Sequence, residues 1–309
     1  MEAILANTIN GLSRYLHENE YDLIIVHGDR VEALAGATVG ALRNILVAHI
    51  EGGEVSGTID ELMRHAITKM SHIHFVGSDT ARKRLIQLGE HPASIFTIGS
   101  PDIDVMLSDS LPSLEEAKAR YDIDFDRYSI AMLHPVTTLP ELQAQHANIF
   151  VDSLIKSERN YIVVYPNNDS GSDEILKAYR RLDGNSNFRV YPSLRFEYFL
   201  TLLKGSEFII GNSSAGIHEA PVYAVPTINI GERQHNRIKH ASVYNIDFNE
   251  KKILETILFV PRAGATPPLF HYGNGDSAAK FMDALDDHGL WIRSRQKYFQ
   301  DLEFHNEER

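Results

Sequence analysis

The stretch DLIIVHGDRVEALAGATVGALRNILVAHI, residues 22–50, decides the fold. It contains two short apolar runs, at 22–26 and 44–50, separated by an amphipathic segment at 30–43. Apolar runs of this length are typical of buried strands, and the longer segment between them is typical of a helix. A strand, a helix and a second strand in this order predict parallel neighbours in one sheet.

The same alternation continues on both sides of a polar stretch around 107–127. Before it, strand-like runs at 72–76 and 94–98 flank a helix-like segment at 80–89. We therefore predict an α/β protein built from two Rossmann-like domains. The strand-like runs after the polar stretch lie at 128–133, 161–166, 188–192, 207–211 and 225–230.

The polar stretch sets the predicted domain boundary. We expect an N-terminal Rossmann-like domain over residues 1–108 and a C-terminal, nucleotide-binding Rossmann-like domain over residues 109–285. A helix over about 286–309 is expected to pack back on the N-terminal domain.

The composition limits the classes of function. The chain of 309 residues has 30 basic and 42 acidic side chains, a formal charge of −12, which disfavours nucleic acid and anionic membrane surfaces as partners. It has no cysteine, so disulfides, thiolate catalysis and cysteine zinc sites are excluded. The strongest apolar runs have the length of strands rather than of membrane spans. We expect a soluble, cytoplasmic protein.

Acidic side chains follow two predicted strands in the N-terminal half. Ligands of open α/β sheets bind beyond the carboxyl ends of the strands, so site residues are expected in these loops. Asp29 lies in VHGDR (26–30) and could either serve a site or cap the following helix. Glu51 follows the next strand in HIEGGE (49–54), and Glu is a poor N-cap, which favours a functional role.

A third acid, Asp60, lies four residues before Arg64 at the start of a predicted helix, so both side chains share one face. The alternatives are an exposed ion pair, stabilising by at most about 0.5 kcal/mol, and a capping box formed by Thr58 and Glu61. Helix capping alone does not explain three carboxylates in one crevice with a cation beside one of them. Crowded acids raise one another's pKa, so such a set could supply protonated and ionised members for acid–base catalysis.

The run GNSSAGIHEAP (211–221) follows a predicted strand in the C-terminal half and opens a helix. Ser213, Ser214 and the backbone N–H groups of this glycine-containing turn suit a diphosphate, although a serine there could simply cap the helix. Glu219 could present its carboxylate to a ribose diol. Arg233, after the next strand, could reach the same phosphates. We predict a nucleotide phosphate site that includes Gly216.

Two further loops contain candidate residues. His134 follows a strand in LHPVTT (133–138), where catalysis and plain packing are both open. In PNNDSGS (166–172), turn chemistry explains most of the composition, but Asn168 and Ser172 could bind a base or sugar. His72 and His74 show no established ligand spacing, so we predict no metal site and no cofactor.

Five of these segments together resemble the UDP-N-acetylglucosamine 2-epimerase family. They are VHGDR, HIEGGEVSGTIDELMRH, LHPVTT, NNDSGS and GNSSAGIHE, and they occur in the family's order and spacing across about residues 20–285. The sequences of these segments are most similar to those of the hydrolysing members that supply N-acetylmannosamine for sialic acid synthesis. The resemblance implies a glycosyltransferase B-like architecture with the active site in the cleft between the domains.

The resemblance also implies a reaction and its residues. UDP leaves C1 as the C2 proton is removed, giving a 2-acetamidoglucal, and water then adds so that C2 ends inverted. The substrate would be UDP-N-acetylglucosamine, and family members are commonly homodimers or homotetramers. The matching catalytic acids are Asp29, Glu51 and Asp60; Arg64 and His134 match positions that stabilise the departing diphosphate; and Ser213, Ser214, Glu219 and Arg233 match nucleotide-binding positions.

One departure from the family concerns the N-terminus. Family members normally begin with a strand and a Gly-Ser/Thr-Arg loop that touches the phosphates, followed by further strand–helix units. Here the first recognisable strand, at 22–26, corresponds to an internal strand of the usual sheet. We expect it to be an edge strand and this form to lack an N-terminal segment.

Other activities compatible with these segments remain open. They are a hydrolysing 2-epimerase of a UDP-linked 2,4-diacetamido-trideoxyhexose used for legionaminic acid, a non-hydrolysing 2-epimerase, and a non-catalytic protein that binds UDP-sugars.

Overall fold

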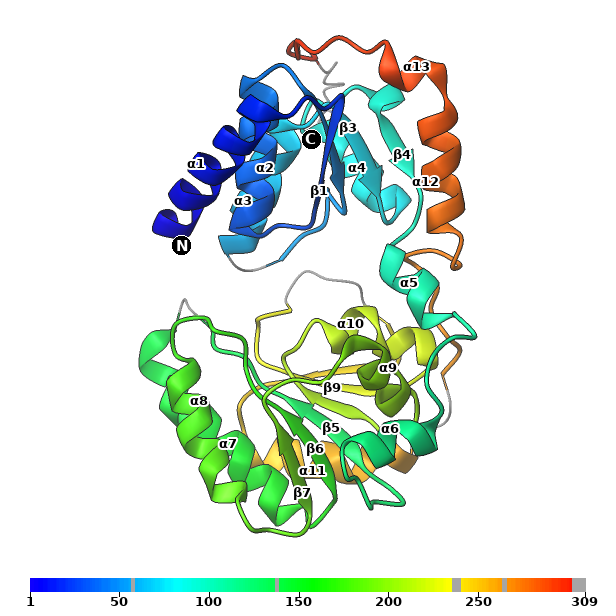
Figure 1. Ribbon diagram of the computed structural model, residues 1–309. Helices are drawn as coiled ribbons and strands as arrows, with labels where there is room; N and C mark the ends of the chain where they lie inside the picture. The colour runs from blue at the N-terminus through cyan, green and yellow to red at the C-terminus, as the bar shows by residue number, and fades with distance from the viewer. Residues whose placement is uncertain (57–58, 137–138, 235–239, 263–265, 302–309) are drawn as a thin grey trace, which may run out of the picture. The chain divides into compact units, whose positions relative to one another are not determined.

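The computed structural model describes residues 1–56, 59–136, 139–234, 240–262 and 266–301 (Figure 1). The chain divides into two compact units, each with its own sheet. The N-terminal unit contains residues 1–55, 59–107 and the C-terminal segment from 271, and the C-terminal unit contains Ser56 and residues 108–270. The predicted fold class of two Rossmann-like α/β domains is confirmed.

The sheet of the N-terminal unit is parallel throughout and has the strand order β1-β2-β3-β4. Its strands are β1 (Leu23–His27), β2 (Leu46–Ile50), β3 (Ile73–Val76) and β4 (Ile95–Thr97). Its helices are α1 (Glu2–Glu18), α2 (Val31–Leu42), α3 (Ile59–Met70), α4 (Asp79–Gln87), α5 (Pro101–Met106), α12 (Ser277–Asp286) and α13 (His288–Trp291), with a 3-10 turn η1 (Pro92–Ser94).

Alternation of side chains along these strands gives the sheet two apolar faces. On one face Val26 and Val47 pack against residues of α2 and α3, among them Ile67. On the other face Phe75 packs against α12, with its ring centroid 4.6 Å from that of Phe281. Figure 1 shows α2 and α3 on one side of this sheet and α12 on the other.

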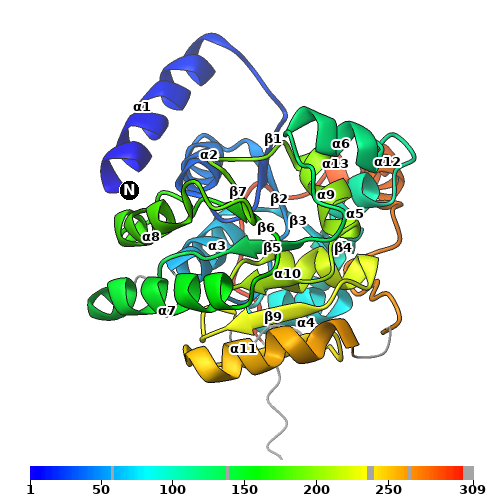
Figure 2. The same cartoon turned by 90° about the horizontal axis from the view of Figure 1, so that it is seen from below.

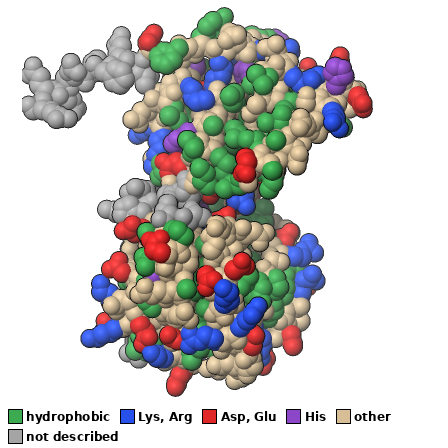
Figure 3. Space-filling view, turned by 90° about the vertical axis from the view of Figure 1, so that its left-hand side faces the viewer, with side chains coloured by type: hydrophobic (Ala, Val, Ile, Leu, Met, Phe, Trp, Pro, Cys, Tyr) green, Lys and Arg blue, Asp and Glu red, His purple; other side chains and the backbone are tan. Residues whose placement is uncertain are grey.

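Helix α1 was not predicted from the sequence. It packs on α2 rather than on the sheet, and Arg43 donates a hydrogen bond to the Leu16 carbonyl at 2.8 Å. Strand β1 lies at the edge of the sheet, and Ile25 on it is 47% exposed. Hydrophobic side chains are exposed on one face of this unit (Figure 3), and Tyr15 and Leu62 are among the exposed large hydrophobic residues of α1 and α3.

The C-terminal unit has a six-stranded parallel sheet in the order β10-β9-β8-β5-β6-β7. Its strands are β5 (Ser129–Met132), β6 (Tyr161–Val164), β7 (Phe188–Tyr191), β8 (Ile209–Gly211), β9 (Thr227–Ile230) and β10 (Val243–Ile246). Its helices are α6 (Leu114–Arg120), α7 (Gln143–Lys156), α8 (Ser172–Tyr179), α9 (Phe196–Lys204), α10 (Ala215–His218) and α11 (Glu250–Phe259), with 3-10 turns η2 (Pro140–Leu142), η3 (Arg180–Leu182), η4 (Ala220–Tyr223) and η5 (Val260–Arg262).

One large core fills the space between this sheet and helices α7, α8 and α11. Phe150 of α7, Tyr179 of α8 and Ile253 of α11 are buried in it with strand residues such as Val163 and Ile228. Figure 2 shows α7 and α11 lying along the sheet. The edge strand β10 was missed in the sequence because its short run VYNI is only partly buried.

The segment after residue 270 differs from the sequence prediction in two respects. Residues 271–285, assigned above to the C-terminal domain, belong to the N-terminal unit, because Phe281, Ala284 and Leu285 pack into the core of its sheet. The expected helix over 286–309 is interrupted: α12 ends at Asp286, α13 ends at Trp291, and residues 292–301 are not helical.

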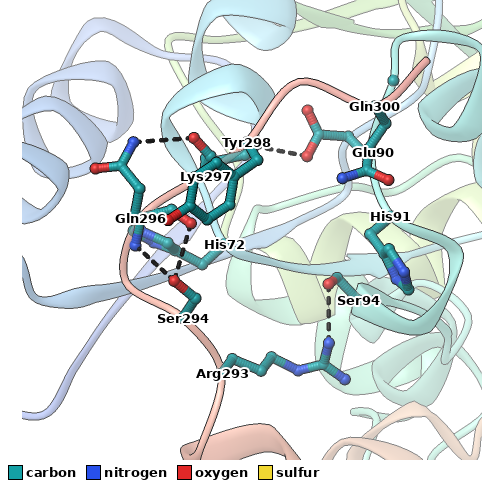
Figure 4. Close-up of a pocket in the computed structure, with 11 residues that line it drawn as sticks. His72, Glu90, His91, Ser94, Arg293, Ser294, Gln296, Lys297, Tyr298 and Gln300 are labelled. Carbon is teal, nitrogen blue, oxygen red and sulfur yellow. Dashed lines mark hydrogen bonds and ion pairs between the residues drawn. The ribbon is translucent and has the colours of Figure 1, made fainter.

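Polar contacts hold residues 292–301 on the N-terminal unit in place of helix packing. Lys297 donates to the carbonyls of Thr68 at 3.2 Å and Ser71 at 2.6 Å, and pairs with the buried carboxylate of Glu90 at 2.6 Å. Figure 4 shows this segment along a pocket of about 260 Å³.

Candidate active site

Asp29 lies just past the end of β1 and pairs with Arg64 of α3. The pairing is well buried, since the Arg64 side chain is 5% exposed and that of Asp29 is 24% exposed. Arg64 also donates to the Glu54 carbonyl at 2.9 Å. The capping explanation for Asp29 is wrong: Arg30 occupies the N-cap of α2, so the Asp29 carboxylate is committed to the guanidinium instead.

Glu51 lies directly after β2 with a backbone φ of +66°, a conformation that residues other than glycine rarely adopt. Its carboxylate accepts a hydrogen bond from the Ser100 hydroxyl at 2.5 Å, and its other oxygen lies 3.0 Å from Nε2 of His27. Strain of this kind at a strand end is typical of functional positions. Glu51 was predicted from the sequence, whereas His27 and Ser100 were not.

The charges around Glu51 shift the pKa of its neighbours. The hydrogen bond to Glu51 raises the pKa of His27 above its ordinary value. Burial, and then repulsion from Glu51, raises the pKa of Asp102, which lies two residues after Ser100. Both shifts favour the protonated form of the group concerned, and perturbed pKa values of this kind cluster at functional sites.

His49 fixes the loop that carries Asp29. Its ring is fully buried, Nε2 donates to the Gly28 carbonyl at 2.9 Å, and Nδ1 accepts from the Thr68 hydroxyl at 3.2 Å. Burial lowers the pKa of His49 to about 3, so the ring stays neutral. A neutral tautomer with one donor and one acceptor matches both partners.

Asp60 lies in the first turn of α3 and is half-buried. It stands one turn before Arg64, on the same helical face, as the sequence predicted. Thr58, the other member of the suggested capping box, lies outside the described residues. The N-terminal unit thus brings Asp29 and Arg64 into direct contact and has Glu51 at the end of the adjacent strand.

In the C-terminal unit, His134 follows β5 and is held by its neighbours on both sides. Asn212 accepts from the His134 backbone N–H at 2.7 Å and donates to its carbonyl at 2.9 Å. The Nδ1 atom of the ring accepts from the Asn167 backbone N–H at 3.1 Å. Burial, and then Arg233, lowers the pKa of His134 to about 4. The ring is therefore neutral with its proton on Nε2, a donor available for an anion.

Arg233 and Gln234 follow β9 and meet the same turn. Both donate to the Asn212 carbonyl, Arg233 at 3.2 Å and Gln234 at 2.8 Å. Asn212 therefore connects the loops after β5, β8 and β9. It lies in the run 211–221 predicted to bind phosphate but was not itself predicted as a site residue. Arg233, with its side chain half-buried, contributes a positive charge beside His134.

The turn Ser213–Glu219 differs in part from the predicted phosphate loop. The hydroxyl of Ser213 accepts from the Ala215 N–H at 3.3 Å, whereas Ser214 is exposed and makes no side-chain cap. The Gly216 N–H donates to the Ser213 carbonyl at 3.2 Å, and a Cβ on Gly216 would lie 2.5 Å from Thr227. The structure thus gives Gly216 a packing role. Glu219 is half-buried at the end of α10.

The polar turn after β6 is held largely by its own hydrogen bonds. The Ser172 hydroxyl donates to the Asp169 carbonyl at 2.5 Å, and Asn167 donates to the Asp169 carboxylate at 2.5 Å. Asn168 is exposed. Its neighbour Asn167, which supports His134, was not predicted, because a backbone N–H contact leaves no mark in the sequence.

The described part of the chain holds neither a metal-binding cluster nor a helix suited to cross a membrane. Among those residues, no group of three or more histidine or acidic side chains is placed to hold a metal ion. None of the helices there is long and apolar enough to cross a membrane.

A protein family and several known proteins match this chain. The family described as UDP-N-acetylglucosamine 2-epimerase matches residues 1–286. A UDP-N-acetylglucosamine 2-epimerase of Neisseria meningitidis serogroup B is 47% identical over 98% of this chain and 81% of its own length. A UDP-N,N'-diacetylbacillosamine 2-epimerase (hydrolyzing) of Legionella pneumophila is 30% identical over 89% of this chain and 72% of its own.

Solved structures agree on the fold. The UDP-GlcNAc 2-epimerase of Methanocaldococcus jannaschii, crystallised with UDP-GlcNAc and UDP, superposes with a TM-score of 0.77 at 20% identity, covering 91% of this chain and 80% of that one. Asp29, Glu51, Arg64, His134 and Asn212 lie in the segments that carry the resemblance, whereas Ser100 and Arg233 lie outside them. The chain belongs to the UDP-N-acetylglucosamine 2-epimerase family.

Proposed function

We propose that this protein is a hydrolysing UDP-N-acetylglucosamine 2-epimerase that converts its substrate into N-acetylmannosamine and UDP. One observation carries the proposal. The edge of the N-terminal sheet combines a carboxylate paired with a buried arginine, Asp29 with Arg64, and a strained carboxylate held by two side chains, Glu51. Asp60 adds a third acid one helical turn before Arg64.

The reaction needs proton transfers that such a set can supply. A base removes the proton at C2, the electron pair forms the C1=C2 bond, and the C1–O bond breaks to release UDP. An acid then returns a proton to C2 from the opposite face while a base activates the water that attacks C1. Three carboxylates suit these steps, because one pairs with Arg64, one contacts His27 and one lies a helical turn before Arg64, so each can face the substrate from a different position.

The C-terminal edge is proposed to bind the nucleotide. His134 offers a neutral Nε2–H donor, Arg233 a positive charge, and Ser213 and Ser214 hydroxyl groups, all of which suit a diphosphate. Glu219 is proposed to accept hydrogen bonds from the ribose hydroxyls, and Asn168 and Ser172 to lie along the base or sugar. Donors aimed at the phosphates would also stabilise the charge that develops as UDP departs.

A second candidate substrate is favoured by one of the comparisons. The Legionella relative is named for UDP-N,N'-diacetylbacillosamine, a 2,4-diacetamido sugar. The same elimination and hydration can act on that sugar, since the C1 and C2 chemistry is unchanged. Its additional acetamido group at C4 would have to be accepted by the sugar pocket.

Product analysis tests both candidates. The protein is incubated with UDP-N-acetylglucosamine and, separately, with the UDP-linked 2,4-diacetamido sugar, and nucleotide and sugar are identified. The proposal expects equal amounts of UDP and free N-acetylmannosamine from the first. Intact UDP-N-acetylmannosamine would contradict the hydrolytic reaction, and turnover of the diacetamido sugar alone would favour the second candidate.

A further inference from the structure

His27 is the last residue of β1 and stands directly before the Gly28–Asp29 turn. Its side chain is 48% exposed, and Nε2 lies 3.0 Å from the Glu51 carboxylate. The contact joins the ends of two adjacent parallel strands, because His27 is paired with Ile50, the residue before Glu51, in the register of β1 and β2. His27 thus reaches Glu51 from the neighbouring strand and leaves the Asp29 carboxylate to Arg64.

The second oxygen of Glu51 is held from another direction. Ser100 caps α5, and its hydroxyl accepts from the Asp102 N–H at 3.3 Å. The hydroxyl's own hydrogen is therefore available for Glu51, which accepts it at 2.5 Å. The two Glu51 oxygens each have a partner, one on β1 and one at the N-terminus of α5. Two contacts from different elements fix both the position and the rotation of a carboxylate.

The surroundings of His27 favour its charged form. The groups that act on its ring are the carboxylates of Glu51, Asp102 and Asp29, which raise its pKa, and burial, which lowers it. His49, the nearby histidine, remains neutral because burial lowers its pKa. An imidazolium beside Glu51 favours the ionised carboxylate, which is the form that can accept a proton.

We propose that His27 is a positioning residue for Glu51, holding that carboxylate ionised and aimed so that Glu51 is the base that takes the C2 proton. This rests on the proposed function. In the step concerned, the C2 proton moves to Glu51, the C–H electron pair becomes the C1=C2 bond, and the C1–O electron pair leaves with UDP. His27 takes no part in bond breaking; it sets the geometry and the charge of the base.

Three substitutions in the whole chain test the role. His27→Ala removes the contact with Glu51, His27→Gln can still donate an N–H but cannot carry a charge, and His17→Ala is a matched control on the exposed end of α1. We expect His27→Ala to lower kcat by about 100-fold, the scale of a misplaced catalytic group, with KM nearly unchanged. His27→Gln should recover part of that loss, and His17→Ala should behave as the parent. Circular dichroism and Tm confirm that each variant is folded.

The pH profile separates positioning from plain structural support. Because the charged form of His27 is the active one, kcat of the parent should fall as pH rises through the raised pKa of His27. His27→Gln should lack that alkaline fall. Parent-like kcat in His27→Ala would overturn the proposal, as would equal losses in both His27 variants with the parent's pH profile retained.

An NMR titration of the His27 ring provides a readout that does not need turnover. The midpoint should lie above the ordinary 6.5 in the parent and drop in Glu51→Gln. A midpoint at or below 6.5, or one that does not change in Glu51→Gln, would overturn the inference. If the parent yields no product from UDP-N-acetylglucosamine, the proposed function fails, while the titration still decides whether His27 and Glu51 form a charged pair.

Discussion

The carboxyl edges of the two sheets differ in the chemistry they collect. At the N-terminal edge, acidic side chains pair with basic ones: Asp29 with Arg64, and Glu51 with His27. At the C-terminal edge, His134 is kept neutral by burial and is fixed by backbone and amide groups, chiefly Asn212. Arg233 adds a cation beside it.

This difference suggests that the two sheets, which share one general design, have different functions: proton transfer at one edge and anion recognition at the other. Titratable groups paired through opposite charges can take up and return protons over a moderate pH range. Neutral donors whose orientation is fixed by the backbone suit the recognition of an anion whose charge does not change during binding. The predictions below test this contrast in order of decreasing expected effect.

The largest effect is expected from removing the acids one at a time. Asp29→Asn, Glu51→Gln and Asp60→Asn should each lower kcat by about 10²- to 10⁴-fold, the usual contribution of a general acid or base, while UDP binding is kept. Steady-state kinetics and calorimetric titration with UDP measure both. Near-parent rates in all three variants would remove the N-terminal edge from the chemistry.

The acid variants should also differ in stability. Asp29→Asn removes the carboxylate that pairs with the buried Arg64, so the free energy of unfolding should fall by about 3 kcal/mol, the lower end for breaking a buried pair. Glu51→Gln keeps one oxygen and one nitrogen that can form hydrogen bonds, so its free energy of unfolding should fall much less. Urea denaturation compares the two, and equal losses would show that the Asp29–Arg64 pair is not buried as described.

The pH dependence of stability gives an effect of similar size. The pKa of His49 is lowered to about 3 and that of His134 to about 4, so the unfolded chain binds more protons than the folded one below the ordinary 6.5. Stability should therefore fall as pH decreases from 6.5 toward 4, by about 1.4 kcal/mol per unit per histidine. Tm measured between pH 7 and 4.5 tests this; His49→Gln should flatten the slope. The raised pKa of His27 acts in a different window: its stabilising contribution is complete below pH 6.5 and is lost as pH rises through the raised pKa, so it leaves the fall between 6.5 and 4 unchanged.

Substitution of Arg233 should act mainly on binding. Arg233→Met should raise the Kd for UDP by about 10- to 100-fold, since a hydrogen bond to a charged group contributes about 1.5–3 kcal/mol. Lys251→Met, which removes an exposed cation from α11, is the control and should leave the Kd unchanged. A parent-like Kd for UDP in Arg233→Met would contradict the proposal that the C-terminal edge binds the nucleotide.

The smallest effect is expected at Ser214. Its hydroxyl is exposed and caps nothing in α10, so Ser214→Ala should leave Tm unchanged and raise the Kd for UDP by up to about 10-fold, the scale of one neutral hydrogen bond. Thermal denaturation and UDP titration are measured on the same sample. A lower Tm with an unchanged Kd would instead indicate a structural hydroxyl.

The sequence predicted most of the fold because strands buried on both faces are continuous apolar runs. The runs at 44–50 and 161–166, for example, became β2 and β6 within a few residues. It did not predict β10, whose partly buried VYNI lies at a sheet edge, or the non-helical course of residues 292–301. In both cases tertiary contacts, such as those of Lys297, decide the conformation.

The site was predictable in part for a different reason. Asp29 and Glu51 are visible as acids at strand ends, but whether Asp29 caps a helix depends on Arg64, 35 residues away. His27 and Ser100 meet Glu51 across 24 and 49 residues, distances at which sequence spacing carries no information about contact. The positions of Asp29 and Glu51 after predicted strands therefore identified these acids but not the groups that hold them.

The most direct test of proton chemistry at the N-terminal edge is the reaction run in D₂O and followed by ¹H NMR. The account predicts free N-acetylmannosamine carrying one solvent deuteron at C2, formed together with an equal amount of UDP, and neither product from Glu51→Gln at a comparable rate. Product that retains the original C2 proton, or sugar that remains attached to UDP, would contradict it.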